Sequence, residues 1–88
     1  MQHLKVSQRT NMWSKGTFTT DKTNKTCQYW VKHFDEPSEK YGIDGGRISK
    51  LTIKVNDKVT CNYDREWDIK PKDETSRLAY KAILKKFN

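Results

Sequence analysis

Three carboxylates alternate in the sequence "DREWD": Asp64, Glu66 and Asp68. Side chains two residues apart lie on the same side of a strand, so these acids could converge on a divalent cation, which prefers oxygen ligands. The same spacing around Trp67 is typical of the solvent-exposed edge at the end of a strand, and we favour this second interpretation. A metal-dependent nuclease built on the three acids is kept only as an alternative.

The histidines and cysteines are too few and too scattered to form a recognisable metal or catalytic site. Cys27 and Cys61 lie in separate strand-like segments without a CxxC spacing, and the only further zinc-type nitrogen ligands are His3 and His33. His33 could act as a general base, but no hydroxyl or thiol nucleophile stands at a recognisable spacing from it. We therefore expect no enzymatic activity, no metal and no cofactor, with both cysteines reduced and buried.

A glycine-rich turn opens the segment "YGIDGGRISKLTIKV", residues 41–55. A phosphate-binding glycine loop needs a strand before it and a helix after it. Here the turn leads into alternating apolar and basic residues, which predict a strand. We interpret the Gly45–Gly46 pair as conformational, supplying a positive φ where the chain enters that strand. The role of the acidic, glycine-rich connection 35–46 stays open.

The formal net charge of the 88-residue chain is +7. A face that binds a polyanion is one interpretation, and a solvated surface that keeps a basic protein in solution is the other. If one helix covers a single face of a sheet, the opposite face stays open and carries the candidate binding residues, with Phe34 expected beside them. These are Lys15, Trp30, Lys32, Lys50 and Lys54. The alternative is that Trp30 belongs to the core and that the lysines protect strand edges.

Four strand-like segments and one helix must position these side chains. The segments are 12–20, 26–34, 47–55 and 59–64, and the third has the clearest alternation, with Leu51, Ile53 and Val55 on one face. The second carries aromatic residues on both faces, so its core face is not determined. We predict an α+β fold: a four-stranded, mostly antiparallel sheet with one C-terminal helix packed on one face (ββββα). Residues 12–88 form the single domain, and residues 1–11 form a disordered or extended lead.

The helix is expected to begin after an Asp73 N-cap, with Glu74 in its first turn. Its apolar side should cover the sheet and comprises Ala79, Tyr80, Ile83, Leu84 and Phe87. A separate basic stripe, Arg77, Lys81 and Lys85, repeats every four residues. Basic residues near a helix C-terminus suit the helix dipole, which is the structural explanation of the stripe.

No apolar run approaches the roughly 18 residues of a membrane span. The start "MQHLKVSQRTN" also lacks the apolar middle of a signal peptide. We therefore predict a cytoplasmic protein without a membrane partner.

Several runs between residues 12 and 88 carry a resemblance to a known family: "KHFDE", "YGIDGGRISKL" and "NYDR-W", together with Trp13 and Gly16. They resemble a domain of unknown function found in small proteins of Gram-positive bacteria and their phages. The resemblance transfers no activity to any residue, and it implies a phage or mobile-element gene product. We expect a small non-enzymatic binding protein that modulates or inhibits a host protein or nucleoprotein complex, such as a defence system. The alternative is a protein that binds nucleic acid directly through the basic, aromatic face, and a homodimer that buries this face is also compatible with the sequence.

Overall fold

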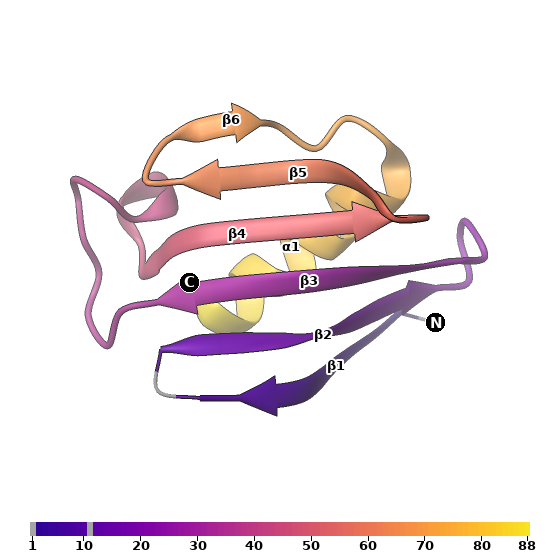
Figure 1. Ribbon diagram of the computed structural model, residues 1–88, viewed down its shortest axis with the longest axis horizontal. Helices are drawn as coiled ribbons and strands as arrows, with labels where there is room; N and C mark the ends of the chain where they lie inside the picture. Colours follow the sequence, from indigo (N-terminus) through magenta and orange to yellow (C-terminus); the bar gives the residue numbers. More distant parts are fainter. Residues whose placement is uncertain (1, 11) are drawn as a thin grey trace.

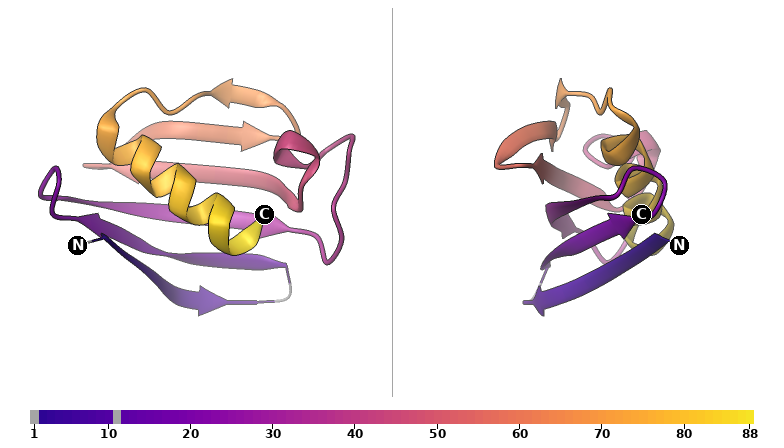
Figure 2. Two further views of the ribbon diagram at one scale, coloured as in Figure 1. Left: turned by 180° about the vertical axis from the view of Figure 1, so that it is seen from behind. Right: turned by 90° about the vertical axis from the view of Figure 1, so that its right-hand side faces the viewer.

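The computed structural model of the protein describes residues 2–10 and 12–88. It contains one antiparallel sheet whose strands follow one another in chain order, so that every strand pairs with its sequence neighbours (Figure 1). Within these described residues, one helix crosses one face of the sheet and no element covers the other face (Figure 2). The elements are β1 (Gln2–Arg9), β2 (Trp13–Thr20), β3 (Lys25–His33), the 3-10 helix η1 (Ile43–Gly45), β4 (Ile48–Val55), β5 (Lys58–Asp64), β6 (Trp67–Ile69) and α1 (Glu74–Phe87).

The prediction of an α+β fold with one C-terminal helix agrees with this structure, but the prediction of four strands is wrong because the sheet has six. The first additional strand, β1, comes from the segment 1–11 that was expected to be a disordered or extended lead. Leu4 and Val6 of β1 are half-buried against the core. The second, β6, spans only three residues, Trp67–Ile69, between the predicted strand 59–64 and the helix. Both are edge strands, which bury little apolar surface and therefore leave a weak pattern in the sequence.

The core lies between α1 and the covered face of the sheet. Ala79, Ile83 and Phe87 repeat every four residues on α1 and are buried against the strands. As predicted, Asp73 caps the helix, because its carboxylate accepts a hydrogen bond of 3.0 Å from the backbone N–H of Ser76. The strands and η1 contribute Phe18, Cys27, Tyr29, Val31, Ile43, Ile48, Leu51, Ile53, Val55, Cys61 and Tyr63 to this core.

Strand β3 has two aromatic faces, and the structure assigns them. Tyr29 is fully buried on the helix side, and its hydroxyl donates a hydrogen bond of 3.0 Å to the carbonyl of Lys5 in β1. Trp30, the next residue, lies on the open side and is half-buried. The alternation of β3 therefore places an aromatic anchor in the core and a second aromatic ring on the uncovered face.

The two cysteines are free and buried, in agreement with their predicted role as small core residues. Cys27 lies on β3 and Cys61 on β5, and β4 runs between them. Two strand spacings are about 9.6 Å, which exceeds the reach of a disulfide. Burial raises the pKa of Cys27 to about 11 and that of Cys61 to about 12, so both thiols stay protonated at neutral pH.

The glycine-rich turn is a conformational device, as predicted. Gly45 has φ +73, a value that glycine adopts without strain, and the turn leads into β4 and not into a helix. A Cβ at Gly42 would lie 1.7 Å from the carbonyl oxygen of Gly46, so the turn closes tightly on itself. The side chain of Asn88 holds the turn in place through two hydrogen bonds. Its Oδ1 accepts a hydrogen bond of 3.0 Å from the N–H of Ile48, and its Nδ2 donates one of 3.1 Å to the carbonyl of Ile43.

Candidate functional site

The open face of the sheet alternates aromatic and cationic side chains across neighbouring strands. In the pairing of β2 with β3, Trp13 lies opposite Lys32 and Lys15 lies opposite Trp30. Directly opposed residues of an antiparallel pair have Cβ atoms about 4.5–5.5 Å apart, and diagonal neighbours lie about 7–8 Å apart. Each indole therefore has an ammonium group both along its own strand and across the sheet.

Two lysines lie over the indole rings. The Nζ of Lys32 is 5.9 Å from the centroid of the Trp13 ring, and the Nζ of Lys54 is 5.5 Å from that of Trp30. Trp13 is 41% exposed, which is high for so large an apolar side chain. Exposed cation–π contacts contribute only about 0.5–1 kcal/mol each. The lysines can therefore leave the rings at little cost.

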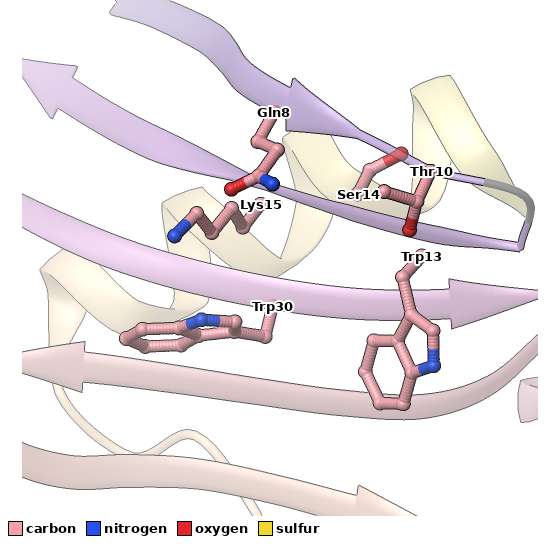
Figure 3. Close-up of a pocket in the computed structure, with 6 residues that line it drawn as sticks. All are labelled: Gln8, Thr10, Trp13, Ser14, Lys15 and Trp30. Atoms are coloured by element: carbon pink, nitrogen blue, oxygen red, sulfur yellow. The ribbon is translucent and has the colours of Figure 1, made fainter.

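A hollow of about 300 Å³ lies between the two indoles (Figure 3). Figure 3 shows Trp13 and Trp30 on neighbouring strands, with Lys15 next to Trp30 and Gln8 on the far side of Lys15. A smaller hollow of about 150 Å³ adjoins it and shares Lys15 and Trp30. The lining of the larger hollow is Gln8, Thr10, Trp13, Ser14, Lys15 and Trp30. Its volume lies at the lower end of the range for small-ligand sites, so it suits one ring system.

The structure places all the predicted candidate residues on this open face. Lys15 comes from β2, Trp30 and Lys32 from β3, and Lys50 and Lys54 from β4. Lys50 differs from the others because its Nζ lies 3.7 Å from a carboxylate oxygen of Asp64 on β5, so part of its charge is neutralised. Phe34, expected beside these residues, is half-buried and lies just beyond the end of β3.

Sequence reasoning missed Trp13 and Gln8 as members of this surface. Trp13 and Lys15 are two residues apart in "WSKGT", so the alternation of a strand predicts that they lie on the same face. Gln8 reaches the open face because the register of β1 against β2 shifts between Val6 and Gln8. A strand irregularity of this kind leaves no signature in the sequence.

The three acids of "DREWD" do not converge. The Asp64 carboxylate pairs with Lys50, and that of Asp68 accepts a hydrogen bond of 3.0 Å from the Nδ2 of Asn62. Within residues 2–10 and 12–88, no group of three histidine, cysteine, aspartate or glutamate side chains is arranged to hold a metal ion. His33 is buried with its ring centroid 5.4 Å from that of Phe87, and its Nδ1 has no hydrogen-bond partner among the described residues.

Comparison with curated protein sequences and with solved structures returned no match. No helix in the described part of the chain is both long and apolar enough to cross a membrane. Residues 12–88 match the model of one family, described as a domain of unknown function (DUF7678). The match begins at residue 12, after β1, so it does not include Gln8 and Thr10, which line the hollow. The chain belongs to this family, DUF7678, and carries β1 in addition to the matched region.

Proposed function

We propose that the protein is a non-enzymatic binding protein whose open sheet face binds single-stranded nucleic acid. The observation that carries this proposal is the pair of indoles, Trp13 and Trp30, with lysines over and between them on an uncovered face. Aromatic rings supply stacking platforms for bases, and lysines supply the attraction for the phosphates. Both kinds of group lie within one cross-strand step of each other.

The spacing of the indoles favours a single strand over a duplex. Diagonal positions on a sheet are about 7–8 Å apart, whereas stacked bases in a duplex follow one another at about 3.4 Å per strand. Two bases on Trp13 and Trp30 would therefore be splayed, which only an unpaired strand permits. As each base stacks, Lys32 and Lys54 leave the indole faces and move to the neighbouring phosphates.

The modulation of a host protein or nucleoprotein complex, expected from the family resemblance, competes with this proposal. A protein partner would also use exposed tryptophans as anchors within a charged rim. The lysines of this face, Lys15, Lys32, Lys50 and Lys54, favour a polyanion, because the salt bridge between Lys50 and Asp64 neutralises only part of their combined charge. The non-enzymatic part of the proposal is supported by the burial of His33 against Phe87, away from the open face.

A titration of a dye-labelled, 20-nucleotide single-stranded DNA, followed by fluorescence anisotropy, tests the proposal. Replacing Trp30 by alanine should weaken binding by about 1–3 kcal/mol, the contribution of one stacked base. Lys32→Met and Lys54→Met should each reduce the slope of log K against log salt by about 0.7. Lys85→Met is the matched control, because Lys85 is exposed on α1 on the opposite side of the sheet.

The proposal fails if Lys85→Met weakens binding as much as Lys54→Met, or if a duplex of the same sequence binds equally well with no effect of Trp30→Ala. Retention of a host protein on the immobilised chain after nuclease treatment, lost on Trp30→Ala and without any binding of DNA, would establish the protein-modulator function instead.

A further inference from the structure

A separate hollow, of about 380 Å³, lies on the other side of the molecule, where the chain passes from β6 into α1. Figure 2 shows this connection beside the first turns of the helix, on the side of the sheet that α1 covers. The volume falls within the range of small-ligand sites. The lining consists of Trp67, Lys70, Pro71, Arg77, Tyr80 and Lys81.

One wall of this hollow is aromatic and held in place by its neighbours. The Trp67 ring lies edge-to-face against Tyr63 and Tyr80, with centroid separations of 5.1 and 5.5 Å. Contacts of this geometry contribute about 0.5–1.5 kcal/mol each beyond area burial, so the indole is fixed before any ligand arrives. The wall therefore offers a preorganised surface on which another ring can pack.

All the charged residues that line the hollow are cations. Lys70 places its Nζ 6.0 Å from the centroid of the Trp67 ring, and the Nε of Arg77 donates a long hydrogen bond of 3.5 Å to the carbonyl of Pro71. Lys81 follows Arg77 by one helical turn. Three acids near the hollow have partners of their own: the carboxylate of Asp68 accepts from Asn62, that of Asp73 accepts from the N–H of Ser76, and that of Glu74 lies 3.8 Å from Lys22.

The helix dipole does not explain this accumulation of positive charge. Lys85 and Lys86 lie in the last turn of α1, where cations are favourable, but Arg77 lies near its beginning, where they are not. Like charges four residues apart, such as Arg77 and Lys81, also repel each other. The structural explanation given for the basic stripe thus covers only its C-terminal end, and an anion between Arg77 and Lys81 would remove the repulsion.

We propose that this hollow is a binding site for a small molecule that combines an aromatic ring with a phosphate, of which a nucleoside monophosphate is the simplest example. The ring packs against Trp67 and Tyr80, and the phosphate lies among Lys70, Arg77 and Lys81. A doubly charged phosphate matches three cations better than a singly charged carboxylate does. Arginine also presents a planar fork of N–H groups that suits phosphate oxygens.

Titration of the full chain with adenosine 5′-monophosphate tests the site. In a Trp13→Phe, Trp30→Phe background, Trp67 is the only tryptophan, so its fluorescence reports on the hollow alone. We expect saturable quenching by the nucleotide. Adenosine, which lacks the anion, and ribose 5-phosphate, which lacks the ring, should each bind at least about tenfold more weakly.

Arg77→Met should raise the dissociation constant of the nucleotide by about tenfold or more, the factor that corresponds to one charge-assisted hydrogen bond. The matched control is Lys85→Met, two turns further along the same stripe, which should leave the constant within about twofold. Far-UV circular dichroism verifies that each variant is folded. Equal effects of the two substitutions, equal binding of ribose 5-phosphate and the nucleotide, or no saturable quenching would overturn the proposal. The outcome is independent of the open face, because the background lacks both of its indoles.

Discussion

The assignment of the two faces of β3 can be tested with one pair of adjacent substitutions. Tyr29→Ala removes a fully buried ring and its hydrogen bond to Lys5. Truncation of a buried aromatic residue costs about 3–5 kcal/mol, and the lost hydrogen bond adds about 1 kcal/mol. Trp30→Ala removes a half-buried ring from the open face, with one exposed cation–π contact and its cross-strand packing, at about 1–2 kcal/mol.

These costs must be compared with the stability of the whole domain. At about 0.05–0.15 kcal/mol per residue, 88 residues give a free energy of unfolding of about 4–13 kcal/mol. Tyr29→Ala therefore removes a large part of the total, whereas Trp30→Ala leaves a folded protein. Urea unfolding followed by far-UV circular dichroism measures both. With a slope of about 1–3 kcal/mol per molar urea, each kilocalorie moves the midpoint by about 0.3–1 M.

The control is Tyr29→Phe, which keeps the ring, removes only the hydroxyl and should cost about 1 kcal/mol. It also supplies the comparison if Tyr29→Ala does not fold. The reasoning is refuted if Trp30→Ala lowers the free energy of unfolding as much as Tyr29→Ala does, or if Trp30→Ala unfolds the protein while Tyr29→Phe melts normally.

Three further predictions concern the scaffold. Gly42→Ala should destabilise the protein far more than Gly45→Ala, because a Cβ at Gly42 would meet the carbonyl oxygen of Gly46. A Cβ at Gly45 meets nothing within 4 Å, so that substitution costs only the positive-φ strain of about 1–2 kcal/mol. Thermal melts that rank the two variants in the reverse order would contradict the turn geometry. Deletion of residues 77–88 should abolish cooperative unfolding, because it removes most of the helix that covers the core, and a truncated chain with an intact cooperative melt would refute this. Burial raises the pKa of Cys27 and Cys61, so the contribution of the protonated thiols to stability is complete below the ordinary thiol pKa of about 8.5 and is lost as the pH rises toward about 11. The free energy of unfolding should therefore fall over this pH range. Iodoacetamide should label neither thiol in the folded protein at pH 8.

The sequence predicts β4 and α1, because the pattern of apolar residues within each segment is enough to identify it. The alternation of Leu51, Ile53 and Val55 predicts the centre of β4, and Asp73 before an apolar four-residue repeat predicts the start of α1. These elements bury one continuous face, so the pattern is strong. The edge strands β1 and β6 bury little apolar surface, so the sequence pattern predicts neither of them as a strand.

Features that depend on pairing between strands could not be predicted. The core face of β3 depends on whether Tyr29 or Trp30 meets the helix, and both are aromatic. The ion pair between Lys50 and Asp64 requires the register of β4 against β5. Gln8 joins the open face only through the irregularity in β1. Each of these follows from three-dimensional neighbours that a periodic pattern does not specify.

The indole N–H signals of Trp13, Trp30 and Trp67 provide the most direct test of the proposed function. Trp13 and Trp30 lie on the open face and Trp67 lies at the hollow on the opposite side, so the third ring reports on that hollow separately. Titration of ¹⁵N-labelled protein with a single-stranded oligonucleotide should shift the signals of Trp13 and Trp30 in a saturable manner, at lower oligonucleotide concentrations than any shift of Trp67. A titration in which Trp67 moves while Trp13 and Trp30 stay unchanged, or in which none of the three moves, would contradict the assignment of the open face as the nucleic-acid site.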